Sequence, residues 1–297
     1  MTFLPRFTLS LILVLSAPAV YAPLAQAQSP SVITNVNLTF TTIDVPGAVY
    51  TGVWGINKTG DMVGNYGQNA NLDSHGFLYS NGTFTYFDYP GAIVTVPMGI
   101  NDSGMIVGYT GQNPVVGFLY DGTAFTTVRR GNDSATYTFG INNAEEVVGG
   151  TGTIYTTKGY EMRDGHYKKI TFPGQYVYGY ASGINNLGVS VGWTSSPEHG
   201  YAYRNGTFRS VDFPGADGTE AWGINDSGII VGWYAAPGGC VCGFASKNGK
   251  YISFSYPGAD TYAVRINAFG EVVGQYTFDY QIFHGFVTSP ITAADFK

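Results

Sequence analysis

Charged side chains are scarce in this sequence. Only 11% of its residues are Asp, Glu, Lys or Arg, against about 25% in an average soluble domain. Basic residues are the rarer kind, with 14 Lys and Arg against 20 Asp and Glu, and no run of them occurs. Because proteins that bind phosphate backbones carry clustered positive charge, we exclude nucleic acid as a partner. The hydrophobic share of 44% is ample for a core and excludes a disordered chain.

Cysteine is nearly absent, and so are the known catalytic motifs. The 297 residues include two cysteines, Cys240 and Cys242, in a glycine-rich loop. This pair lacks the further ligands of a zinc site, whereas a strained local disulfide, free thiols and intermolecular pairing remain open. No Gly-x-Ser-x-Gly elbow, phosphate loop or Cys/His metal spacing occurs. The sequence therefore predicts no catalytic residue, no metal site and no cofactor.

Long apolar runs are lacking outside the N-terminus. Residues 9–20 form an apolar run that is shorter than the ~20 residues of a membrane helix. Arg6 precedes it, and Ala25-Gln26-Ala27 follows with the small-x-small pattern of a signal-peptide cleavage site. We therefore expect residues 1–27 to be removed and the mature chain to be secreted, extracellular or periplasmic, without a membrane span.

The dominant feature of the sequence is an internal repeat. The tripeptide Gly-Ile-Asn occurs five times and Arg265-Ile266-Asn267 is a sixth copy. Each copy continues with Val-Gly six residues after the asparagine and then with a Gly-aromatic pair, which are Val63-Gly64 and Gly76-Phe77 in the first copy. A period of about 40–45 residues is typical of β-propeller blades. The asparagines are 44, 41, 43, 40 and 42 residues apart: Asn57, Asn101, Asn142, Asn185, Asn225 and Asn267.

Each repeat is predicted to form four short antiparallel strands. In the first copy these are residues 53–57, 62–66, 76–79 and 83–88. Lys58-Thr59-Gly60 provides a turn between the first two strands, and Asn81-Gly82 supplies the two positive φ angles of a type I′ turn between the last two. No segment shows a helical apolar period with caps, so we expect almost no helix.

The two ends of the repeat region complement each other. The sixth repeat stops after its third strand at residues 284–287, and residues 38–47 resemble a fourth strand without the other three. Pairing the two completes a ring and removes two open sheet edges. We therefore predict an all-β fold, a six-bladed β-propeller of four-stranded antiparallel blades whose last blade is closed by the N-terminal strand, with an open β-solenoid or stacked sheets as alternative. The expected division is a signal peptide at 1–27, a linker at 28–37, the propeller at 38–288 and a tail at 289–297.

The repeated motifs carry a family resemblance. The pattern Gly-Ile-Asn-x-x-Gly-x-x-Val-Gly, then His-Gly-Phe-Leu-Tyr, then Phe-Thr-x-x-Asp-x-Pro-Gly-Ala resembles the bacterial HAF-type extracellular repeat family. The resemblance covers residues 38 to about 287. It implies export and repetition, and it brings no activity or catalytic residues to this chain.

Aromatic residues at the ends of the second strands are the candidate binding residues. In a propeller the loops after the second and fourth strands share one face, and the loops after the second strand vary in length here. Variable loops on a rigid scaffold commonly carry binding, and aromatic planes with little charge suit sugars. The alternative is that these side chains pack between blades. The candidates are Tyr66, Tyr109, Trp193, Trp233, Tyr234 and Tyr276.

Polar residues in the same loops and turns are given structural roles. His75, His199 and His284 begin third strands of separate repeats, so we expect a structural role for each, such as a hydrogen bond to an adjacent blade. Their loops also contain acidic residues, which we expect to be solvated: Asp73, Glu198 and Asp279. The repeated asparagines begin tight turns, and their side chains are expected to bond the backbone two residues on. Asp102 and Asp226 follow two of them, with too few oxygen ligands nearby for calcium.

These observations favour a secreted, non-enzymatic binding module for a glycan or another extracellular polymer or protein, acting as a monomer. A polysaccharide-acting hydrolase or lyase is the alternative, by analogy of fold alone. A structural or adhesive surface protein is a third possibility. The feature that separates an enzyme from a binding module is whether carboxylates or histidines converge at one mouth of the ring.

Overall fold

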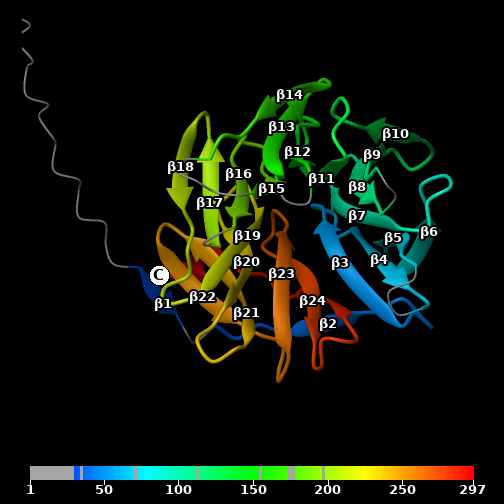
Figure 1. The fold of residues 1–297 in the computed structure, drawn as a ribbon. Helices are drawn as coiled ribbons and strands as arrows, with labels where there is room; N and C mark the ends of the chain where they lie inside the picture. Colours follow the sequence, from blue (N-terminus) through cyan, green and yellow to red (C-terminus); the bar gives the residue numbers. More distant parts are fainter. Residues whose placement is uncertain are drawn as a thin grey trace, which may run out of the picture.

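The computed structural model describes residues 30–33, 36–69, 73–111, 114–153, 156–172, 178–195 and 198–297. The predicted signal peptide at 1–27 lies outside them. Six sheets surround a central axis (Figure 1), which confirms the predicted six-bladed β-propeller of four-stranded antiparallel blades. One of the six sheets carries a fifth strand, added at its outer edge.

The strands run from the inside of each blade to its outer edge in chain order. Blade one contains β3 (Tyr50–Ile56), β4 (Met62–Gly67), β5 (His75–Ser80) and β6 (Thr83–Phe87). Blade two contains β7 (Thr95–Ile100), β8 (Ile106–Thr110), β9 (Gly117–Tyr120) and β10 (Phe125–Val128). Blade three contains β11 (Ala135–Ile141), β12 (Val147–Gly152), β13 (Lys158–Arg163) and β14 (His166–Lys169).

The second half of the ring repeats this order. Blade four contains β15 (Gly179–Ile184), β16 (Ser190–Thr194), β17 (His199–Arg204) and β18 (Thr207–Ser210). Blade five contains β19 (Gly218–Ile224), β20 (Ile230–Ala235), β21 (Val241–Lys247) and β22 (Lys250–Phe254). Blade six contains β23 (Asp260–Ile266), β24 (Val272–Thr277), β25 (His284–Thr288) and, from the other end of the chain, β2 (Phe40–Ile43).

The N-terminal strand closes the ring as predicted. Strand β2 pairs antiparallel with β25, with Phe40 opposite Thr288 and Ile43 opposite Gly285; in Figure 1 the blue β2 lies beside the red strand next to β24. The segments expected as linker and tail also carry structure. Strand β1 (Ser31–Ile33) pairs in parallel with β22 of blade five. The 3₁₀ helix η1 (Ala293–Phe296) ends the chain, with the Phe296 side chain buried.

The Val-Gly and Gly-aromatic motifs pack against each other within each blade. Gly64 of β4 lies opposite Phe77 of β5, and a Cβ on Gly64 would come within 2.7 Å of Cζ of Phe77. The glycine therefore makes room for an aromatic ring that fills the space between two blades. The corresponding rings are all buried: Phe77, Phe118, Tyr160, Tyr201, Phe244 and Phe286.

The hairpin turns follow the predicted chemistry. Both turn residues have positive φ at Asn81-Gly82, Asp164-Gly165, Asn205-Gly206 and Asn248-Gly249, as a type I′ turn requires. At Asp121-Gly122 only the glycine does, because the Asp121 carboxylate accepts hydrogen bonds from the backbone of Thr123 and Ala124 in a wider turn. The turns after the first and third strands lie on one face of the ring, and the remaining loops lie on the other.

Candidate functional site

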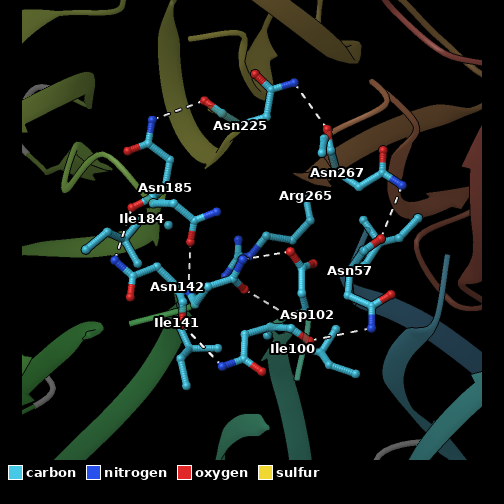
Figure 2. A pocket seen from close by; sticks show the side chains of 18 of the residues that line it. Asn57, Ile100, Asp102, Ile141, Asn142, Ile184, Asn185, Asn225, Arg265 and Asn267 are labelled. Carbon is cyan, nitrogen blue, oxygen red and sulfur yellow. Dashed lines mark hydrogen bonds between the residues drawn. The ribbon is translucent and has the colours of Figure 1, made fainter. Parts of the chain in front are cut away.

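A ring of six asparagines closes one end of the central channel (Figure 2). Each side-chain Nδ2 donates a hydrogen bond to the backbone carbonyl of the asparagine in the next blade, over 3.1–3.5 Å. The last bond runs from Asn267 back to Asn57, so the ring has no ends. The sequence predicted the turn role of these residues and missed the contact between blades.

The same side chains also cap their own turns, as predicted. Oδ1 of Asn101 accepts from the backbone N of Ser103 at 3.2 Å and of Met105 at 2.9 Å. A second tier of bonds lies outside the ring, where Asp102 accepts from the backbone N of Lys58 and Asp226 from that of Asn186. The two aspartates therefore join neighbouring blades.

Arg265 fills the channel inside the asparagine ring (Figure 2). It stands where the other five repeats have glycine, and it is only 9% exposed. Its guanidinium donates to backbone carbonyls of blades three to six, at Phe139, Ser182, Trp222 and Val264. Burial lowers the pKa of Arg265 to about 9, so the side chain still carries its charge at neutral pH. The asparagine ring and Arg265 together line a pocket of about 90 Å³ at this end of the channel (Figure 2).

The opposite end of the channel opens into an aromatic cavity of about 250 Å³, which we call the axial cavity. Its walls come from blades one to five, and its rings contact one another, as Trp54 and Trp222 do at 6.4 Å between ring centroids. The lining residues are Trp54, Met98, Tyr109, Tyr137, Phe139, Tyr180, Trp193 and Trp222.

Each inner strand has a β-bulge, and in four of the six strands the bulge residue lines this cavity. In β3 the ladder to β4 shifts between Val53 and Gly55, which leaves Trp54 unpaired. A bulge re-aims the extra residue, and the same shift recurs in every inner strand. The residues at this position are Trp54, Met98, Phe139, Ser182, Trp222 and Val264.

A second layer of the wall consists of cross-strand pairs. Tyr180 of β15 lies opposite Trp193 of β16, with 5.0 Å between ring centroids. In blade five the corresponding pair is Glu220 with Trp233. Directly opposite residues in a sheet share a face, so Glu220 and Trp233 face the same side of their blade. Blades three, four and six have tyrosine at the register position of Glu220. At the second-strand position that Trp193 and Trp233 hold in their blades, blades one and six have polar residues, Asn65 and Gln275.

Two tryptophan indoles donate hydrogen bonds to these polar side chains, and a third indole does not. Nε1 of Trp54 donates to Oδ1 of Asn65 at 2.5 Å, and Nε1 of Trp222 donates to Oε2 of Glu220 at 2.8 Å. Nε1 of Trp193 is buried and has no hydrogen-bond partner in the part of the chain that the structure describes. The cavity thus has an aromatic lining, with Asn65 and Glu220 behind two of its indoles and one buried indole N–H without a partner among the same residues.

The six predicted binding residues divide into two groups by strand alternation. Tyr109 and Trp193 line the axial cavity, and Trp233 lies on the same side of its blade, 5.5 Å from the ring of Tyr262. Each residue of the other group is one position further along its strand and faces away. Tyr234 stacks on Phe213 and Tyr276 on Tyr256, each at 3.7 Å, and Tyr66 contacts Tyr86 and His75.

The sequence did not single out the remaining lining residues. Trp54, Met98, Phe139 and Trp222 each stand directly before Gly-Ile-Asn, and a large apolar residue at that position in four repeats was the available signal. No residue pattern within a single repeat predicts the bulge that turns this apolar side chain inward.

Two carboxyl groups meet beside the cavity, which corrects the expectation that Glu198 is solvated. Glu220 is 4% exposed, and burial, together with a hydrogen bond and repulsion from Glu198, raises its pKa well above the ordinary value. Glu198 is partly buried, and its Oε2 lies over Gly218, since a Cβ there would come within 2.5 Å of it. Asp73 and Asp279 instead accept bonds from their own loops.

The three histidines have a structural role, as predicted, but each bonds an aspartate of its own blade and not an adjacent blade. Nδ1 lies 2.8 Å from Asp88 for His75, 3.1 Å from Asp212 for His199 and 2.7 Å from Asp44 for His284. The repeats that begin the third strand with histidine are also those with Asp-x-Pro-Gly after the fourth. This co-occurrence was visible in the sequence.

The remaining candidates carry little chemistry. Sγ of Cys240 and Sγ of Cys242 lie 2.8 Å apart as free thiols. Among the described residues, no three His, Cys, Asp or Glu side chains come together as metal ligands. No helix in the same residues is long and apolar enough to cross a membrane.

Comparison with known proteins supports the fold and goes no further. No protein-family model and no curated protein matches the chain. Virginiamycin B lyase from Staphylococcus aureus is similar in structure, with a TM-score of 0.51, 11% identity and coverage of 85% of this chain and all of the lyase. The Aleuria aurantia lectin, in complex with Fucα1-6GlcNAc, has a TM-score of 0.50, 11% identity and coverage of 83% and 93%. A gluconolactonase from Xanthomonas campestris has a TM-score of 0.50, 12% identity and coverage of 88% and 97%. A lyase, a lectin and a lactonase share this fold, so the fold by itself assigns the chain no activity.

Proposed function

We propose that this protein is a secreted, non-enzymatic binding module that holds a glycan or another extracellular polymer in the axial cavity. The observation that carries the proposal is the cavity itself, whose lining is almost entirely aromatic. Asn65 and Glu220 lie behind this lining and accept hydrogen bonds from the indoles of Trp54 and Trp222. Aromatic rings pack on the apolar face of a pyranose. The HAF-type resemblance, which implies export, supports the same proposal.

The carboxyl pair argues against the hydrolase alternative. Glycosidases that use two carboxyl groups hold them roughly 5 to 9.5 Å apart, so that a sugar or a water molecule fits between them. Glu220 is only 4% exposed, and Glu198 is close enough to raise its pKa, so this pair does not flank an open cleft. A structural or adhesive protein that uses no cavity is the remaining alternative.

A matched pair of variants tests the proposal. We expect an array of immobilised glycans to identify a ligand for residues 28–297, and Trp193→Ala to weaken its binding by about 1–3 kcal/mol, as loss of an aromatic anchor does. The melting temperature should fall only slightly. Fluorescence titration of the tryptophans measures both affinities.

Tyr234→Ala is the control, because Tyr234 is a strand-end aromatic that stacks between blades. It should lower the melting temperature and leave the affinity unchanged. If no glycan binds, or if Trp193→Ala binds as the wild type does, the axial cavity is not the binding site.

A further inference from the structure

Behind Trp222, which lines the axial cavity, lies a pair of carboxyl groups without a positive partner among the described residues, the buried Glu220 and the partly buried Glu198. Glu220 lies on β19, two residues after Gly218, and alternate residues of a strand face the same side. The Glu198 carboxylate lies over Gly218, and Thr219 N donates to the Glu198 carbonyl at 3.3 Å. The two side chains therefore meet on one face of β19.

The groups around this pair are aromatic or neutral. Trp222 donates to Glu220, Trp233 is its cross-strand neighbour, and Tyr180 and Tyr262 are close enough for Glu220 to raise the pKa of each. Arg265 on β23 directs its guanidinium to backbone carbonyls. Within the described residues no Lys, Arg or His forms an ion pair with Glu198 or Glu220.

In the described part of the chain, this pair of carboxyl groups lacks a positive charge to balance it. A buried carboxyl with a carboxyl neighbour either keeps a proton or requires a cation. Aromatic rings around a carboxylate form the environment in which proteins hold organic ammonium groups, because the ring faces attract the cation. A neutral sugar would leave the pair uncompensated.

We propose that the axial cavity takes an amino sugar, with its ammonium group held at Glu220 and Glu198 and its pyranose ring against Trp193, Tyr180 and Trp222. This inference rests on the proposed function and narrows its ligand to a cationic glycan. Trp193, whose Nε1 is buried without a hydrogen-bond partner among the described residues, is one of the rings that line the cavity. On binding, the positive charge of the ligand replaces the proton of the carboxyl pair.

Two tetrasaccharides of the same linkage, one with free amines and one with N-acetyl groups, test this. A β-1,4-linked glucosamine tetramer, at mildly acidic pH where its amines are protonated, should bind residues 28–297 about tenfold more tightly than its N-acetylated counterpart. That factor corresponds to about 1.4 kcal/mol, within the range of a cation held against aromatic rings. Calorimetry in two buffers of different ionisation heat should show that binding releases protons.

Glu220→Gln separates charge from shape, because glutamine can still accept from Trp222 Nε1. It should abolish both the preference for the glucosamine tetramer and the proton release, while the affinity for the acetylated tetramer is unchanged. Glu145→Gln is the control, since Glu145 is exposed in the turn after β11 on the opposite face and the variant removes the same net charge. It should bind both tetramers as the wild type does.

The outcomes separate the ammonium site from the broader proposal of glycan binding. Equal binding of the tetramers, or tighter binding of the acetylated one, overturns the ammonium site and leaves the glycan-binding proposal standing. Binding of neither tetramer also overturns it, and the glycan array then decides the broader proposal. A preference that persists in Glu220→Gln shows that other groups hold the ligand.

Discussion

Single side chains at the axis distinguish this ring from a regular repeat. Five copies have glycine before Ile-Asn, and the sixth has Arg265, whose guanidinium bonds four bulge carbonyls at once. Blade five has Glu220 where three other blades have tyrosine. Both substitutions bury a titratable group. Neither could be interpreted from the sequence, because what each side chain meets depends on other strands, which for Arg265 are 43, 83 and 126 residues away.

Glu220 gives a pH-dependent prediction at the residue scale. Its pKa is raised in the folded state, so the native protein holds the proton more tightly than the unfolded chain does. The resulting cost is absent below the ordinary glutamate pKa of about 4.3 and grows as the pH rises toward the folded value. Glu220→Gln should therefore raise the melting temperature at pH 7.5 and leave it nearly unchanged at pH 4. A lower melting temperature at pH 7.5 would mean that the ionised pair is stabilising.

At the scale of elements, strand order and turns were predictable and the contacts across the ring were not. The spacing of Val-Gly and Gly-aromatic pairs predicted four strands per repeat, because each motif is a local packing requirement such as Gly64 under Phe77. The binding candidates were chosen from strand ends without regard to alternation, so Trp193 and Tyr234 were grouped although they face opposite sides. The inter-blade bond of each asparagine spans 40 or more residues, and no local pattern encodes it.

The asparagine ring yields a prediction for the turns. Asn101 is 3% exposed, and Asn101→Ala removes its bonds from Ser103 N and Met105 N together with the one to the Asn142 carbonyl. At about 0.5–1.5 kcal/mol each, the free energy of unfolding should fall by roughly 2–4 kcal/mol, measured by urea denaturation. Asn186→Ala, in the exposed second tier, is the comparison and should cost less than about 1 kcal/mol. Equal losses would show that the inner ring has no special weight.

For the whole molecule, the split repeat was the most informative part of the sequence. A fourth strand at one end and three strands at the other define a closed ring, and the pairing of β2 with β25 follows from it. The added strand β1 and the docking of η1 were not predicted. Their segments lie outside the repeat and offer no pattern to compare.

Two truncations test the closure. Starting the chain at residue 48 removes β1 and β2, including the buried Ile43 and Val45. Loss of these two side chains alone should cost about 3–6 kcal/mol, and the exposed edge of β25 should promote aggregation. Starting at residue 36 removes β1 only and should lower the melting temperature much less. If both truncated chains melt alike and stay monomeric, β2 does not hold the ring closed.

The closure also sets an order of events during synthesis. Asp44, just after β2, bonds His284, 240 positions later. At about 5–20 residues per second, the ribosome needs about 10–50 s to make the intervening chain. Blades one to five can form in that interval, while the apolar side of β2 stays exposed because β25 has not yet been made. One of the first strands to be made is thus among the last to dock, and any factor that shields a nascent segment would act on this one longest.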